Sequence, residues 1–187
     1  MRIQPLKIAG SARIDLAPYG DARGYFMRTY DKASFAAAGL PTDWVQANES
    51  LSVAKGTLRG LHYQRPPHTE TKLVRAVSGA VIDVFVDLRA GSPTFGQWDS
   101  VELSAGAKNM VVVPRGCAHG FCSLTENSLV SYLVDNAYNG AAEGGVRWDD
   151  PDLSIAWPIT GAPIISDKDA AWPLLRDVAP IELGTWR

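Results

Sequence analysis

Residues 81–89 read VIDVFVDLR, and the pattern of this stretch decides the fold class. Its side chains alternate between two faces of an extended chain, with Ile82, Val84, Val86 and Leu88 on one face and Asp83, Phe85, Asp87 and Arg89 on the other. An apolar face that recurs at every second residue predicts a β-strand with one apolar face.

Six further β-rich runs surround this strand, separated by Gly, Pro, Asn and Ser. They are TLRGLHYQ (57–64), KLVRAVSG (72–79), WDSVEL (98–103), NMVVVP (109–114), GFCSL (120–124) and SLVSYLVD (128–135). Seven strands within about 80 residues leave little room for helical crossovers, so the sheets should be antiparallel. We therefore expect an all-β protein, a small antiparallel barrel or jelly roll whose interior can hold one small ligand.

Helices should be few and short. The clearest helical stretch is KASFAAAGL (32–40), which Asp31 can cap and Gly39 can end. From Asp149 onward the chain is rich in proline and tryptophan, which predicts an irregular arm over the barrel with one short final helix. A chain of 187 residues is most simply one domain. Its expected parts are an N-terminal arm (1–45), a barrel core (about 46–140) and a C-terminal arm (141–187).

Composition excludes several classes of partner. The chain has 18 Lys and Arg against 20 Asp and Glu, a formal net charge of −2, so nucleic acid is not expected to bind. The first residues lack the apolar core of a signal peptide, and no segment approaches the roughly 20 apolar residues that span a membrane. We expect a cytoplasmic protein in which Cys117 and Cys122 are free thiols.

The run RGLHYQ (59–64) contains His62, one of three histidines in the chain. Strict alternation places Arg59 and Leu61 on one face of this strand, and Gly60, His62 and Gln64 on the other. Three roles are open to His62: a metal ligand, a histidine of the core, or a general base.

A metal centre needs more ligands than the sequence offers. Cupin-type barrels bind iron or manganese through two or three histidines and a carboxylate. His68 follows His62 only after two prolines, and His119 stands alone. We therefore expect no metal ion at His62.

A purely structural core does not suit the neighbours of His62. Arg59, Lys72 and Arg75 lie close to it in the sequence, and burying unpaired cations costs several kcal/mol. Converging cations suit an anionic ligand such as a phosphate instead. This favours a binding groove around His62.

Five ordered motifs carry a family resemblance. They are residues 59–98, VPRGCAHGF (113–121), SYLVDNAY (131–138), GGVRWDDPDLSIAWP (144–158) and SDKD (166–169). Together with DARGYF (21–26) they resemble the dTDP-4-dehydrorhamnose 3,5-epimerase family over nearly the whole chain. The resemblance implies a cupin-type antiparallel jelly-roll barrel with a few short helices.

The resemblance also implies an activity that needs no cofactor. Family members invert the stereocentres on both sides of the ketone in a nucleotide-linked 4-keto-6-deoxy sugar. The expected reaction converts dTDP-4-dehydro-6-deoxy-D-glucose to dTDP-4-dehydro-L-rhamnose through an enolate. The chemistry requires a base on one face of the sugar, an acid on the other and positive charge near the enolate oxygen.

By this resemblance, His62 is the base and Asp169 is the carboxylate that orients it. Asp83 is a rival orienting carboxylate that the residues alone do not exclude. Tyr132 matches the acid on the opposite sugar face, and Lys72 matches the cation near the enolate.

The resemblance further implies a substrate-binding set, in which Tyr138 packs against the nucleotide base. The set comprises Arg23, Phe26, Arg28, Gln46, Asn48, Glu49, Arg59, His119, Tyr138, Glu143 and Lys168. In relatives the N-terminal arm often completes the site of a neighbouring subunit. A homodimer with exchanged arms is therefore expected.

Three positions depart from the family pattern. Arg28 stands where the family usually has Glu, and residues 46–50 read QANES where the family often has QDNHS, which changes positions 47 and 49. These changes predict a different nucleotide (GDP, CDP or UDP) or an altered sugar, unless the residues simply face solvent. Inversion at C3 or C5 alone, a ketoisomerase, a non-catalytic sugar-nucleotide-binding cupin and a metal-dependent cupin remain alternatives.

Overall fold

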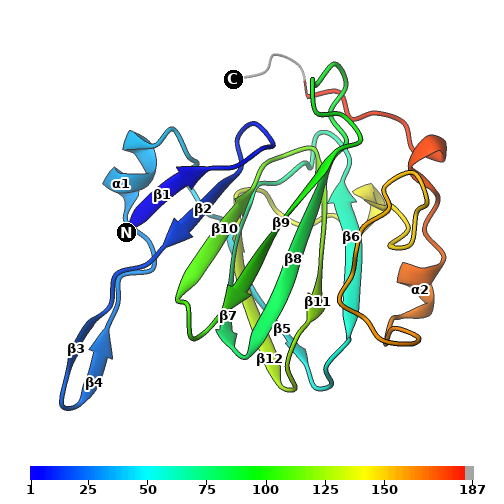
Figure 1. Cartoon of the computed structure of the whole chain (residues 1–187). Helices are drawn as coiled ribbons and strands as arrows, with labels where there is room; N and C mark the ends of the chain where they lie inside the picture. Colours follow the sequence, from blue (N-terminus) through cyan, green and yellow to red (C-terminus); the bar gives the residue numbers. More distant parts are fainter. Residues whose placement is uncertain (184–187) are drawn as a thin grey trace.

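The protein is described by a computed structural model over residues 1–183, so the last four residues of the predicted C-terminal arm lie outside the description. Two antiparallel sheets face each other (Figure 1). The larger contains, in order, β1 (Arg2–Pro5), β2 (Ala12–Asp15), β10 (Asn109–Val113), β7 (Lys72–Ser78), β12 (Ser128–Val134) and β5 (Gln46–Ser52). The smaller contains β13 (Glu143–Gly145), β6 (Leu58–Gln64), β11 (Cys117–Ser123), β8 (Ala80–Asp87) and β9 (Trp98–Ser104). The predicted all-β jelly roll is confirmed.

The expected strand at residues 81–89 is β8, and both of its faces are buried. Val84 and Val86 pack toward the C-terminal segment, outside the barrel. Val81 and Phe85 point into the barrel, between the two sheets. The face that carries aspartates is therefore an interior wall, and its polar groups need partners within the protein.

Apolar side chains from both sheets fill the barrel interior beyond the site. Val74, Val111 and Val130 of the larger sheet meet Phe85 and Leu103 of the smaller one, and all five are fully buried. Each such side chain contributes roughly 1.5–3 kcal/mol when buried. This core fixes the spacing between the sheets and with it the shape of the interior.

The predicted first helix is confirmed as α1 (Lys32–Ala37). The side chain of Asp31 accepts a hydrogen bond of 2.9 Å from the backbone N–H of Ser34, and Gly39 after the helix has φ of +69°. Phe35 is fully buried and meets Tyr30 edge-on. The helix thereby covers the outer face of the larger sheet around β2 and β10.

A hairpin of β3 (Tyr19–Asp21) and β4 (Gly24–Phe26) extends away from the barrel (Figure 1). Its side chains are exposed, including Tyr19 at 75% and Phe26 at 67%. Sequence patterns missed this hairpin and also β1, β2 and β5. These strands are short or carry polar residues on both faces, so their alternation is weak.

The C-terminal segment runs along the outer face of the smaller sheet, where Leu153, Val178 and Ile181 cover β8. It contains the short final helix α2 (Asp167–Ala170), which lies beside β6 (Figure 1). Two 3-10 turns, η1 (Gly140–Ala142) and η2 (Leu175–Asp177), complete the helical content. Across residues 1–183, no helix is long and apolar enough to cross a membrane.

The two cysteines are free thiols, as predicted, and the structure shows that both are buried. Burial in apolar surroundings raises the pKa of the Cys122 thiol to about 11 and also raises that of Cys117. Both thiols are therefore in the unreactive protonated form at neutral pH.

Candidate active site

A bulge in β6 brings Arg59 and His62 to the same cavity. On the neighbouring strand β11, His119 pairs with His62 and Phe121 pairs with Arg59, so three steps along β6 match two along β11. The prediction from strict alternation, that Arg59 and His62 face opposite ways, is wrong for this reason. Both side chains line one cavity.

Two glycines allow the bulge. Gly60 has φ of +123°, and a Cβ atom there would lie 2.6 Å from Cα of Gly120 on β11. Only glycine fits such a close approach of two backbones at this φ. The glycines in RGLHYQ and CAHGF therefore shape the strand that carries His62.

We call the cavity between the two sheets and α2 the site cavity. It has a volume of about 290 Å³. Its lining residues are Ser50, Arg59, His62, Lys72, His119, Gly120, Phe121, Tyr132, Ser166, Lys168 and Asp169. All four predicted catalytic residues are among them.

His62 is held by the carboxylate of Asp169, more than 100 residues later in the chain. Nε2 of His62 lies 2.7 Å from Oδ1 of Asp169, and the backbone N–H of Gly60 donates a 3.0 Å hydrogen bond to Oδ2. The side chain of Asp169 is 7% exposed. Burial disfavours its charged form, but the hydrogen bonds from His62 and Gly60 outweigh burial and hold the pKa of Asp169 below its ordinary value.

The ionised carboxylate selects the tautomer of His62. Because Asp169 accepts a proton at this contact, neutral His62 carries its hydrogen on Nε2 and keeps its lone pair on Nδ1. No described residue hydrogen-bonds to Nδ1. A neutral imidazole with one free lone pair, backed by a carboxylate, is suited to act as a general base.

His119 forms a second histidine–carboxylate pair, with Asp83. The distance between Nε2 of His119 and Oδ2 of Asp83 is 2.8 Å, and both side chains are buried. Asp83 therefore orients His119, and its candidacy as the partner of His62 is wrong. The other oxygen of Asp83 is buried without a hydrogen-bond partner in the described part of the chain.

Tyr132 and Lys72 line the same cavity from the larger sheet. Tyr132 lies on β12 and Lys72 on β7, and burial followed by the negative charge of Glu70 raises the pKa of Tyr132. The ammonium of Lys72 lies 3.3 Å from Oε1 of Glu70. A protonated phenol and a cation thus share one cavity with the imidazole of His62.

A second cluster of predicted residues adjoins the site cavity through Lys168. The Tyr138 hydroxyl donates to Glu143 at 3.2 Å, and Glu143 accepts from Lys168 at 2.6 Å. The backbone N–H of Tyr138 donates to the side chain of Gln46 at 2.7 Å. Four residues of the predicted substrate-binding set are therefore interconnected, and Lys168 joins them to the site cavity.

The alternation of side chains along β5 places two predicted substrate-binding residues, Asn48 and Glu49, on opposite faces of the strand. Asn48 pairs with Tyr132 and shares a face with Ser50, which lines the cavity. The alternate residues Ala47 and Glu49 are exposed on the outer face of the sheet. A place for Glu49 in this chain's own site cavity is thus wrong, because the strand directs its side chain outward.

Arg23, Phe26 and Arg28 do not reach the site cavity of their own chain. Arg23 and Phe26 lie in the exposed hairpin, where Arg23 forms a 2.6 Å ion pair with Asp21. Arg28 lies 3.9 Å from the N-cap residue Asp31. None of these three residues lines the site cavity of its own chain.

Glu70 and Trp172 are site residues that sequence reasoning missed. Glu70 contacts Lys72, and the ring of Trp172 lies edge-on to His62 with 6.2 Å between ring centroids. A Cβ atom at Gly145 would lie 2.4 Å from the Trp172 ring, so the absence of a side chain at Gly145 leaves room for the indole. No local motif marks either residue, because each acts through contacts that the fold creates.

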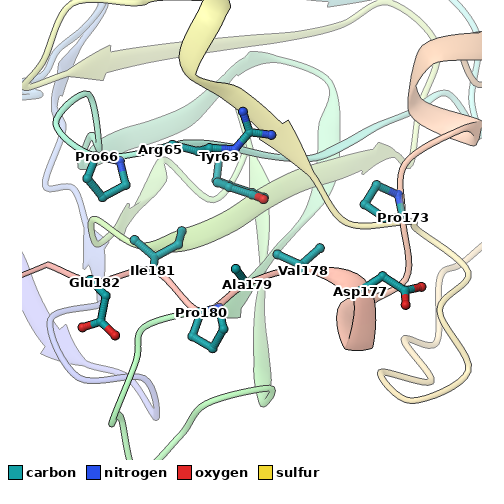
Figure 2. A pocket seen from close by; sticks show the side chains of 10 residues that line it. All are labelled: Tyr63, Arg65, Pro66, Pro173, Asp177, Val178, Ala179, Pro180, Ile181 and Glu182. Atoms are coloured by element: carbon teal, nitrogen blue, oxygen red, sulfur yellow. The ribbon is translucent and has the colours of Figure 1, made fainter.

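A larger hollow, of about 480 Å³, lies against residues 173–182 (Figure 2). Val178 and Ile181 of the C-terminal segment point toward Tyr63 near the end of β6, and Pro180 also lines the hollow. No histidine and none of the predicted site residues lines it. We therefore place the chemistry in the smaller site cavity.

Among residues 1–183, no group of three or more His, Cys, Asp and Glu side chains is arranged to hold a metal ion. His62 and His119 instead each contact one carboxylate.

Comparison with known proteins identifies relatives along most of the chain. The family model described as dTDP-4-dehydrorhamnose 3,5-epimerase matches residues 5–177. A dTDP-4-dehydrorhamnose 3,5-epimerase from Methanothermobacter thermautotrophicus is 44% identical over 90% of this chain and 91% of that protein. A dTDP-4-dehydrorhamnose 3-epimerase from Streptomyces niveus is 42% identical over 95% of this chain and 85% of that protein.

The fold is shared with solved structures of the same kind. The dTDP-6-deoxy-D-glucose-3,5-epimerase from Legionella pneumophila, solved in complex with dTDP-4-keto-L-rhamnose, superposes with a TM-score of 0.92. It is 37% identical, over 98% of this chain and 99% of that chain. The chain therefore belongs to the dTDP-4-dehydrorhamnose 3,5-epimerase family.

Proposed function

We infer that this protein is an epimerase that converts dTDP-4-dehydro-6-deoxy-D-glucose to dTDP-4-dehydro-L-rhamnose by inverting C3 and C5. The observation that carries the inference is the convergence of the His62–Asp169 pair, Tyr132 and Lys72 in one cavity. Family membership supplies the substrate. The residues that line the cavity account for each proton transfer without a cofactor.

The proposed reaction begins at the C–H bond beside the ketone. Nδ1 of His62 takes the proton, and the bonding pair forms an enolate whose oxygen the Lys72 ammonium stabilises. Asp169 stabilises the imidazolium that results. Tyr132 then donates its proton to the opposite face of the same carbon, which inverts the centre. His62 releases one proton to solvent and Tyr132 regains one, and the cycle repeats at the second carbon.

Epimerisation in deuterium oxide, followed by NMR, tests the inference. We expect deuterium at both C3 and C5 of the product. Absence of label at either carbon, with folded protein and authentic substrate, would contradict it.

Inversion at C3 alone is the second candidate, because the Streptomyces niveus relative carries the name of a 3-epimerase at 42% identity. Label at C3 without label at C5 would favour this activity. Arg28 motivates a parallel comparison of dTDP-, GDP-, CDP- and UDP-linked substrates. Higher kcat/KM for a carrier other than dTDP would identify an altered nucleotide preference.

We also propose that the protein is a homodimer whose N-terminal hairpins are exchanged. Two features support it: the exposed aromatic side chains of the hairpin, and the exposed apolar residues Val45, Leu51 and Val53 on and beside β5. An edge strand with apolar side chains in water favours association. The reducing cytoplasm is the proposed location, since both cysteines are free thiols.

Subunit mixing tests the exchange. Arg23→Ala and His62→Ala variants should each be nearly inactive, and mixing them after reversible dissociation should restore activity. Restoration is expected because a mixed dimer would contain one site with both His62 and an intact Arg23. If the arm served its own subunit, mixing would restore nothing.

A further inference from the structure

The indole of Trp172 lies beside the proposed base but does not line the site cavity. Its ring is edge-on to the imidazole of His62, with 6.2 Å between ring centroids and 73° between ring planes. Edge-to-face packing is a favourable geometry for two aromatic rings. The proposed reaction gives this indole no task, so its place beside the base needs another explanation.

The indole packs directly on the backbone of β13. Gly145 of this strand pairs with His62 on β6. The three nearest neighbours of a Cβ atom at Gly145 would all be indole atoms of Trp172, at 2.4, 2.4 and 2.6 Å. The ring therefore occupies the space above the ladder position opposite His62, which a side chain at Gly145 would fill.

Lys168 encloses the indole from the side of α2. Its ammonium lies 5.7 Å from the centroid of the Trp172 ring, within the range of a cation–π interaction. The same ammonium donates a 2.6 Å hydrogen bond to Glu143. Lys168 directly precedes Asp169 in α2, so the indole touches both the imidazole and the helix that carries its carboxylate partner.

The base depends on this support because α2 is short. A helix of four residues has little stability of its own, so packed neighbours must fix the position of Asp169. The imidazole of His62 must also stay turned toward the carboxylate to keep the 2.7 Å contact. Functional side chains hold such a geometry through neighbours that restrict their rotamers.

We propose that Trp172 is a positioning residue for the proposed base: its indole holds the His62 imidazole against Asp169 and so leaves Nδ1 free to take a proton. The kinetic part of this inference rests on the proposed epimerase activity. The packing of the two rings does not.

Trp172→Ala tests the kinetic part. An imidazole that can turn away from Asp169 spends less time in the productive geometry, so we expect kcat to fall by about 10-fold or more. KM should change little, because Trp172 does not line the site cavity. Trp172→Phe keeps an aromatic ring beside His62 and should recover most of the lost kcat. A raised KM with unchanged kcat in Trp172→Ala would contradict the inference.

Trp157→Ala is the matched control. Trp157 is another half-buried tryptophan of the C-terminal segment, and it packs against the core on the outer face of the smaller sheet. Its replacement should lower the stability of the fold and leave kcat unchanged. An equal fall of kcat in the Trp157→Ala and Trp172→Ala variants would show a general loosening of the segment and would overturn the inference.

Gly145→Ala disturbs the indole without changing it. The added methyl group overlaps with the Trp172 ring, so kcat should fall. In the Trp172→Ala background the same methyl group has no ring to displace, and it should lower kcat little further. Effects of the two substitutions that simply multiply in the double variant would count against a shared mechanism.

Proton NMR tests the positioning without a substrate. Nε2 of His62 and Nε2 of His119 each lie beside a carboxylate, at 2.7 and 2.8 Å, so both ring N–H groups can be followed in protein with isotope-labelled histidine. We expect Trp172→Ala to speed the exchange of the His62 N–H with water several-fold and to leave that of His119, the internal reference, unchanged.

Equal exchange of the His62 N–H in the folded wild type and the folded Trp172→Ala variant would overturn the inference. If the wild type failed to epimerise any substrate, the proposed function would fail, while this exchange measurement would still decide the role of Trp172.

Discussion

At the scale of single residues, the decisive contact is the 2.7 Å hydrogen bond between His62 and Asp169. It fixes the tautomer of the imidazole and leaves Nδ1 as the basic atom. Asp83, the alternative carboxylate, is equally buried but contacts His119. His62 and His119 therefore each have their own carboxylate partner and can have different roles in the site.

Replacing Asp169 with Asn tests this contact. The amide can donate to His62 and thereby favour the wrong tautomer, so we expect kcat to fall by about 10²-fold or more with little loss of folded structure. Steady-state kinetics and circular dichroism measure the two effects. Asp167→Asn on the same short helix is the matched control, since Asp167 is exposed. Equal activities of the two variants would contradict the assigned contact.

The pairing of His62 with Asp169 could be predicted from the family resemblance but not from sequence patterns. More than 100 residues separate the two, and nothing in the sequence around either residue indicates that they meet in the fold. Lys72 and Tyr132 could be placed on strands by alternation, and both strands were found. Glu70 and Trp172 could not be singled out, because their roles exist only once β6, β7 and α2 are packed together.

At the scale of elements, β6 shows why alternation predicted the strand and misplaced a side chain. The run TLRGLHYQ is β-rich, and the strand covers 58–64. The bulge at Gly60 then shifts the register against β11 by one residue. Arg59, predicted to face away from His62, lines the same cavity because of this shift.

Replacing Gly60 with Ala tests the bulge. A methyl group at φ of +123° would meet the backbone of Gly120, so we expect loss of stability by roughly 1–3 kcal/mol beyond the backbone strain alone. Gly56→Ala isolates that strain, because Gly56 has φ of +79° with no atom within 4 Å of the added group. Denaturant unfolding compares the two variants. An equal loss in both would show that the close approach to β11 is unimportant.

At the scale of the whole molecule, the jelly roll depends on polar groups buried within its walls as well as on its apolar core. Asp87 at the end of β8 is fully buried and accepts hydrogen bonds from Arg89, Ser92 and Thr94. Burial opposes its charge, but these donors prevail and lower its pKa. The fold class could be predicted from seven strand patterns in the sequence. This hydrogen-bond network could not, because it forms only when the loop after β8 folds back onto the end of that strand.

Replacing Asp87 with Ala should destabilise the protein by about 3–5 kcal/mol, because it removes a buried ion pair with Arg89 and the acceptor of the Ser92 and Thr94 hydroxyls. A carboxylate with a lowered native pKa stabilises the fold above its unfolded pKa and loses that effect as pH falls through the native value. Stability measured from about pH 6 to pH 3 should therefore fall less steeply in the variant. The exposed Asp43→Ala control should change neither quantity appreciably.

The central claim is that His62 and Tyr132 transfer protons on opposite faces of one sugar. Substrate incubated in deuterium oxide with the Tyr132→Phe variant and analysed by NMR tests it most directly. The claim predicts that His62 still exchanges the C3 hydrogen for deuterium while the configuration is retained, and that His62→Ala does neither. Inversion by Tyr132→Phe at the wild-type rate, or exchange by His62→Ala at that rate, would contradict it.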